Sequence, residues 1–229
     1  MRKYLIMLLS SWATCVFAQT NVQNSFDADE AKFDEQLKAL LSVQSSYLEK
    51  RQTNELRQVH KQISDLIEQR KYPRAIHALQ QAKNEKERFY ALDAAAKESL
   101  NIGKKDDARA YADELIGLMN KYRDDGNYGN AVQDVNIVRG RLALSEGRID
   151  EAKADLLKAG NSPGSWTMNS FGPNMSLAKE LLEKGEKDVV LQYFDLCRKF
   201  WSFHGDELDK WSQEVKAGKI PNFGANLEY

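Results

Sequence analysis

The sequence is poor in cysteine and histidine. It contains two cysteines, Cys15 and Cys197, and Cys15 lies in an apolar N-terminal stretch. If that stretch is removed, Cys197 has no partner for an intramolecular disulfide. The three histidines, His60, His77 and His204, are far apart, whereas a structural zinc site needs about four Cys or His ligands at short spacing. We therefore expect no disulfide, no metal site and no cofactor.

Glycine and proline are missing from the first part of the chain. No glycine precedes Gly103, and residues 19–72 contain neither glycine nor proline. Leucine, valine and isoleucine recur there at steps of three and four residues, which is the period of an amphipathic helix. No segment shows the sustained alternation of apolar and polar residues that is typical of a strand. The predicted fold class is all-α.

Long apolar runs are also lacking, apart from one at the N-terminus. Arg2 and Lys3 precede an apolar run over residues 4–17, which ends beside Ala18 in a spacing typical of a signal-peptidase site. The run is well short of the roughly 20 residues needed to span a bilayer. We therefore predict a cleavable export signal at residues 1–18, a periplasmic or secreted mature protein, and no transmembrane span after cleavage.

An excess of positive charge is absent as well. The chain has 33 Lys and Arg against 34 Asp and Glu, and loss of the signal, which carries two of the basic residues, leaves a net charge of −3. Nucleic-acid binding depends on many Lys and Arg contacts to phosphate. A nucleic-acid partner is therefore not expected.

What the chain does contain is a recurring pattern of small and bulky residues around four predicted helix breaks, at Arg70, Gly103, Gly147 and Gly185. Five, nine and twelve residues after these breaks lie Ala75, Leu79 and Ala82; Ala108, Ala112 and Leu115; Ala152, Leu156 and Ala159; and Val190, Phe194 and Cys197. Seven residues before three of the breaks lie Ala96, Gly140 and Ala178. Antiparallel helices approach closely where a small residue makes room for a large one. The pattern predicts helical hairpins centred on the breaks.

Two segments resemble a known repeat. The stretch "GRLALSEGRIDEAKADLLKAG", residues 140–160, is similar to a tetratricopeptide repeat, and "QRKYPRAIHALQQA", residues 69–82, resembles the turn and second helix of another. The breaks lie 33, 44 and 38 residues apart, where the family repeats every 34 residues. Arg70 stands where the family has a turn glycine, and Ile63 where it has a small residue. The resemblance implies a superhelix of about four degenerate hairpins with capping helices.

A second resemblance concerns the C-terminal half. The tract of residues 169–201 and the ending "NFGANLEY" resemble a group of uncharacterised bacterial exported proteins. That resemblance implies no activity.

These patterns predict the domain organisation. The polar residues 19–28 are expected to be mobile, and residues 29–229 to form one helical domain. Residues 31–48 form an extra helix that either caps the stack or pairs with a second copy, so a homo-oligomer stays open. Residues 206–229 are expected to cap the other end. The side chains that would dock there are Leu208, Trp211 and Val215 at helical spacing, followed by Pro221, Phe223, Leu227 and Tyr229 in an extended tail.

The loop over residues 161–174 is one candidate site, because loops held on a rigid scaffold often carry recognition. Two interpretations stay open, and we favour the first. In one, Trp166, Met168 and Phe171 fold inward and cover an apolar gap. In the other, a binding rim is formed by Trp166, Asn169, Ser170, Phe171 and Asn174. A second loop, residues 122–130, lacks the spacing of a calcium-binding loop and is interpreted as a solvated turn.

A second candidate site follows from the repeat resemblance, which implies a concave surface built from the first helix of each hairpin. That surface would include the residue six positions before each break: Ser64, Lys97, Arg141 and Lys179. Three of these four are basic and could receive carboxylates of an extended peptide or of an acidic envelope polymer. The neighbouring residues would be His60, Tyr90, Asp93, Asp134 and Asn174. The alternative is that all of them are ordinary exposed helix residues.

No set of residues demands catalysis. Cys197 shares a helix face with Val190 and Phe194, which is typical of a core cysteine. We therefore predict an exported, non-enzymatic scaffold that binds a protein or peptide. The alternative is a small cell-envelope hydrolase with its site in the loop at residues 161–174.

Overall fold

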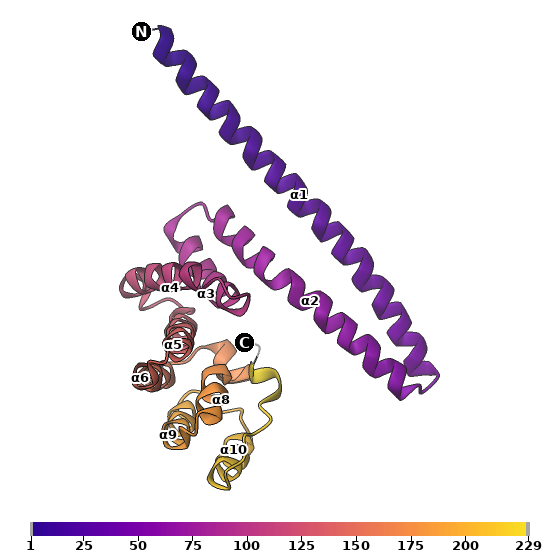
Figure 1. Ribbon diagram of the computed structural model, residues 1–229, viewed down its shortest axis with the longest axis vertical. Helices are drawn as coiled ribbons and strands as arrows, with labels where there is room; N and C mark the ends of the chain where they lie inside the picture. Colours follow the sequence, from indigo (N-terminus) through magenta and orange to yellow (C-terminus); the bar gives the residue numbers. More distant parts are fainter. Residues whose placement is uncertain (1, 228–229) are drawn as a thin grey trace. The chain divides into compact units, whose positions relative to one another are not determined.

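The computed structural model describes the backbone of residues 2–227 and side chains from Val22 onward (Figure 1). The described residues form helices and contain no strand, which confirms the all-α prediction. The helices are α1 (Arg2–Glu49), α2 (Thr53–Gln81), α3 (Glu85–Asn101), α4 (Lys105–Met119), α5 (Tyr128–Ser145), α6 (Ile149–Gly160), α7 (Trp166–Phe171), α8 (Ser176–Glu183), α9 (Lys187–Cys197) and α10 (Glu207–Lys216), with short 3-10 helices η1 (Asn120–Tyr122) and η2 (Gly224–Leu227). Across these described helices, no apolar stretch is long enough to cross a bilayer.

The chain divides into two compact units, one up to His77 and one from Ala78 onward. This division differs from the single domain predicted for residues 29–229. The predicted mobile segment, residues 19–28, is part of α1.

The first unit is a helical hairpin in which α1 and α2 run antiparallel (Figure 1). The positions shielded from solvent recur at alternating steps of three and four residues. On α1 they include Phe26, Glu30, Phe33, Leu37, Leu40, Gln44 and Tyr47, and on α2 Leu56, Val59, Ile63, Leu66, Arg70, Pro73 and His77. This spacing forms the seam of a two-helix coiled coil. At one end of the seam the rings of Phe26 and His77 stack with their centroids 3.7 Å apart.

Arg70 lies inside this seam and does not interrupt the helix. α2 runs without interruption from Thr53 to Gln81. The Nε of Arg70 donates to Oε1 of Glu30 at 2.9 Å, and Nη2 of Arg74 donates to Oε2 of Glu30 at 2.7 Å. The hydrogen bond from Arg74, supported by that from Arg70, lowers the pKa of Glu30. The predicted hairpin at Arg70 is therefore wrong, because this arginine pairs with α1 from within a continuous helix.

In the second unit, successive helices pack in pairs: α3 with α4, α5 with α6, and α8 with α9. The three connecting turns contain Gly103, Gly147 and Gly185, each with a positive φ of 79° to 85°. The residue after each glycine donates its backbone N–H to the carbonyl five positions earlier, over 2.8, 2.9 and 3.0 Å. This is the Schellman arrangement that closes a helix with a left-handed residue. The three turns thus share one local geometry.

Small residues lie where these helices meet, as predicted. Ala96, Ala108, Ala112, Ala152, Ala159 and Ala178 are all at most 1% exposed. A β-carbon on Gly140 would lie 2.2 Å from Cδ2 of Leu177, so only glycine fits without displacing that leucine. α3 and α8 both contact α5, and the first helices of the three pairs are therefore neighbours.

The C-terminal segment packs into the same core. Leu208, Trp211, Val215 and Phe223 are all buried there. The Trp211 ring meets Phe223 and Trp201 with centroid separations of 5.0 and 5.8 Å. Cys197 is fully buried in this core, which agrees with its interpretation as a core residue.

Candidate functional site

The connection between α6 and α8 is anchored first at the beginning of α5. Ser162 Oγ donates to the Gly129 carbonyl at 2.7 Å, and the backbone of Gly164 lies directly against Gly129. Ser165 Oγ donates to Oδ1 of Asn130 at 2.6 Å and also accepts from the Met168 N–H at 3.0 Å. The second bond caps α7, a six-residue helix within this loop. The sequence had suggested an irregular connection here.

The far end of the connection is held by a buried network around Asn174. The Asn174 N–H donates to Oε1 of Gln133 at 3.0 Å, and the Tyr193 hydroxyl donates to the Asn174 carbonyl at 2.8 Å. The Asn174 side chain accepts from the Ser176 N–H at 2.8 Å, next to the start of α8. Asn174 is only 3% exposed. Asn174 therefore does not lie on an exposed rim, because its polar groups close the loop onto α5, α8 and α9.

α7 displays two aromatic side chains on its surface. Trp166 is 90% exposed and Phe171 is 56% exposed, while Met168 between them is buried. The inward-packing interpretation is therefore correct for Met168 and wrong for Trp166 and Phe171. Oδ1 of Asn169 accepts from the Ser202 N–H at 2.8 Å. The two exposed aromatic side chains thus stand on a helix that is fixed at both ends.

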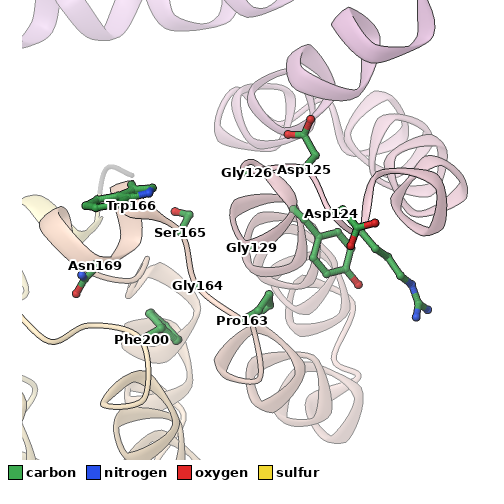
Figure 2. Close-up of a pocket in the computed structure, with 12 residues that line it drawn as sticks. Asp124, Asp125, Gly126, Gly129, Pro163, Gly164, Ser165, Trp166, Asn169 and Phe200 are labelled. Atoms are coloured by element: carbon green, nitrogen blue, oxygen red, sulfur yellow. The ribbon is translucent and has the colours of Figure 1, made fainter.

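Trp166 borders an open groove that we call the loop groove, with a volume of about 500 Å³. Figure 2 shows Trp166 and Ser165 on one side of this groove and Asp124, Asp125 and Gly126 on the other. The remaining lining residues are Arg123, Tyr128, Gly129, Pro163, Gly164, Asn169 and Phe200. The two loops that the sequence singled out, residues 122–130 and 161–174, therefore line one groove.

The wall formed by residues 122–130 is held by Asp125. Its carboxylate accepts hydrogen bonds from the Tyr90 hydroxyl, from the Asn127 N–H at 2.9 Å and from Lys86. These bonds, that from Tyr90 foremost, lower the pKa of Asp125 to about 2. The loop is therefore tied to α3 and is more than a solvated turn.

A second hollow, the acidic hollow, has a volume of about 180 Å³ and touches other residues of α7. It is lined by Asp93, Asn130, Gln133, Asp134, Thr167, Met168, Phe171 and Gly172. Burial raises the pKa of Asp93. Burial, followed by the neighbouring Asp93 charge, raises the pKa of Asp134 to about 7. The charge of Lys97 opposes both shifts but does not cancel them.

The basic residues of the predicted column each interact with a different partner within the chain. Nε of Arg141 donates to Oε1 of Glu180 at 2.8 Å, and its Nη1 donates to Oδ1 of Asn101 at 3.0 Å. Lys179 forms an ion pair with Glu183, one turn further along α8. Lys97 is half-buried, 4.0 Å from Oε1 of Glu98. The fourth member, Ser64, lies in the first unit. The positive charges in the second unit thus meet carboxylates of the chain itself.

Sequence reasoning placed Asp93 and Asp134 near the column but missed that they share one hollow. Forty-one positions separate them, and no local spacing links them. A detectable signal was that each lies on the first helix of a hairpin, ten and thirteen residues before the turn glycines Gly103 and Gly147. Elsewhere, within the part of the chain that the structure describes, no three His, Cys, Asp or Glu side chains are grouped to hold a metal ion.

Comparisons with protein-family models, curated proteins and solved structures give no match to this chain.

Proposed function

We propose that the chain is an exported, non-enzymatic scaffold that binds a peptide or a protein segment across α7. The scaffold consists of tetratricopeptide-like hairpins, and the identical turns at Gly103, Gly147 and Gly185 support this assignment. In such stacks the first helices line the binding side. Here the first helices are α3, α5 and α8, and the acidic hollow opens between residues of α3, α5 and the loop.

The observation that carries the proposal is the display of Trp166 on a fixed helix. A tryptophan that is 90% exposed leaves a large apolar ring in water. With the half-exposed Phe171 on the same short helix, it adds apolar surface beside a groove, and contiguous apolar surface of this kind favours an interaction site. Because α7 is capped by Ser165 and tied by Asn169, its backbone is already ordered and loses little further entropy on binding. Tryptophan is also among the residues that contribute most to interfaces.

The spacing of the two aromatic side chains favours an extended segment as the ligand. Trp166 borders the loop groove and Phe171 borders the acidic hollow. They are five positions apart along α7, which corresponds to a rise of roughly 7–8 Å. An extended peptide covers that length with about two to three residues. A segment that contacts both the loop groove and the acidic hollow must therefore cross α7.

Partner capture tests the proposal. A photo-activatable cross-linker is placed at Ser170, next to Phe171 on α7, and activated in the native cell envelope. We expect adducts with a defined protein, and we expect Trp166→Ala with Phe171→Ala to reduce them. The control is Ile102→Ala, which removes an exposed apolar side chain at the α3–α4 turn. No adduct, or equal capture by the double variant and the control, contradicts the proposal.

Export is a separate part of the proposal and has its own test. Fractionation of cells that produce the full chain is expected to place the shortened, mature form outside the cytoplasm. Deletion of residues 2–18 should retain the protein in the cytoplasm. Accumulation of the intact chain in the cytoplasm would contradict export.

A hydrolase is the second candidate function, and one observation favours it. Asp93 and Asp134 face one hollow, and the pKa of Asp134 is raised to about 7. Carboxyl pairs of this kind serve as general acid and base. Turnover of envelope glycans or peptides by the purified chain, abolished by Asp134→Asn, would support this candidate over the scaffold.

A further inference from the structure

We propose that the acidic hollow is a subsite for one cationic side chain, a lysine ammonium or an arginine guanidinium, of the bound segment. This inference rests on the proposed function and names the chemistry of the ligand at one position.

The size of the hollow suits a single side-chain head group. Its volume of about 180 Å³ equals roughly six water molecules at about 30 Å³ each. A folded domain is too large to enter, whereas the end of one long side chain fits. The hollow is bordered by the half-exposed Phe171, so a side chain can reach it from the surface of α7.

The charges in the hollow call for a cation. Asp93 and Asp134 contribute two carboxyl groups, and among the described residues the positive charge of Lys97 acts on both of them. Asp93 accepts hydrogen bonds from the Ala94 N–H at 2.6 Å and from the Asn127 side chain. Within residues 22–227, the Asp134 carboxylate accepts no hydrogen bond. Asp134 is half-buried, and a carboxylate that is partly removed from water and has no donor gains free energy when a donor or a cation reaches it.

The remaining lining fits the rest of a lysine or arginine side chain. Phe171 and Met168 offer apolar surface for the methylene groups, and an aromatic ring also attracts a cation. The Asn130 side-chain amide donates a hydrogen bond to the Thr167 hydroxyl at 3.3 Å, and Oε1 of Gln133 accepts one from the Asn174 N–H. These polar groups are engaged within the chain. The Asp134 carboxylate is therefore the group in the hollow that most needs a ligand.

The test uses the full chain and two tripeptides, acetyl-Ala-Lys-Ala-amide and acetyl-Ala-norleucine-Ala-amide, which differ only in the ammonium group. Binding at pH 7.5 is followed by NMR through the side-chain amides of Asn130 and Gln133. We expect the lysine peptide to shift both amides and to bind at least about tenfold more tightly, as for a hydrogen bond to a charged group. Equal binding of the two peptides would overturn the inference.

Three variants make the test specific. Asp134→Asn is expected to lower the affinity for the lysine peptide about tenfold. Lys97→Ala is expected to make the lysine peptide bind severalfold more tightly, because the Lys97 ammonium competes with the peptide for the same carboxylates. Asp113→Asn removes an exposed carboxylate on α4 and is expected to change nothing. Wild-type affinity in Asp134→Asn, with an intact unfolding transition, contradicts the subsite. So does weaker binding in Lys97→Ala.

Partner capture separates this inference from the proposed function. Capture that is lost in Trp166→Ala but kept in Asp134→Asn means that the scaffold stands and the subsite is wrong. If the wild-type chain binds the lysine peptide at the hollow but captures no partner, the proposed function fails and the cation site remains. A neutral sugar that shifts the same amides, where the lysine peptide does not, overturns the inference in favour of a glycan ligand.

Discussion

Gly129 and Gly164 approach so closely that a β-carbon on Gly129 would lie 1.9 Å from the carbonyl oxygen of Gly164. This contact presses the loop that carries α7 against the beginning of α5. It fixes the orientation of Trp166 relative to the loop groove, which both glycines also line (Figure 2).

Gly129→Ala is therefore expected to destabilise the second unit by at least about 2 kcal/mol, because backbone atoms have to move apart. Urea unfolding measures the change. Gly117→Ala is the matched control, since a β-carbon there meets nothing within 4 Å on α4. It should raise stability by up to about 1 kcal/mol. Equal effects of the two substitutions would refute the close contact.

Asp134→Asn should stabilise the protein in a pH-dependent manner. The native pKa of about 7 lies above the ordinary value of 3.8, so between these values the native state holds a proton that the unfolded state has lost. The contribution of Asp134 to stability therefore falls as pH rises from about 4 to 7. We expect a gain of about 1–3 kcal/mol at pH 8 that shrinks toward zero near pH 4.

Urea unfolding of this variant at several pH values measures the gain. Asp113→Asn, on the exposed face of α4, serves as the comparison. A gain that is independent of pH would show that Asp134 is not a desolvated carboxyl.

Tyr193→Phe removes the hydroxyl that donates to the Asn174 carbonyl and accepts from Nε2 of Gln133 at 3.3 Å. Both groups are buried, so we expect a loss of about 1–3 kcal/mol. Thermal unfolding measures it. Tyr128→Phe, at a half-buried position in the loop groove, should change stability by less than about 0.5 kcal/mol. Equal losses would argue against the network.

Phe33→Ala tests the seam of the first unit. Phe33 is 4% exposed, and the Arg74 guanidinium lies 4.4 Å from the centre of its ring. Loss of the ring should accelerate hydrogen exchange of the α1 and α2 amides, corresponding to about 2–4 kcal/mol. Leu48→Ala, at a position 55% exposed, should leave exchange nearly unchanged. An unchanged exchange rate in Phe33→Ala would contradict the seam.

The helical pairs of the second unit could be predicted because their causes are local. A glycine that ends a helix with positive φ, as at Gly103 or Gly147, and small residues at fixed offsets from it are visible in the sequence. The hairpin predicted at Arg70 is wrong, because α2 continues through this position and the Arg70 side chain pairs with Glu30, 40 positions away. A local pattern contains no information on that ion pair.

The site was harder to predict for the same reason. The direction in which Trp166 points depends on which side of a six-residue helix meets α5 and Ser202, and this depends on tertiary contacts. Asp93 and Asp134 come together only because α3 packs against α5. The aromatic residues of the loop could be recognised as candidate binding residues from the sequence, whereas the loop groove and the acidic hollow beside them are visible only in the folded chain.

The central claim is that a bound segment crosses α7. Hydrogen exchange of the full chain, with and without the captured partner, tests it most directly. We expect slower exchange in residues 166–172 and in the first two turns of α5. Protection confined to α1 and α2, or no protection in residues 166–172, would contradict it.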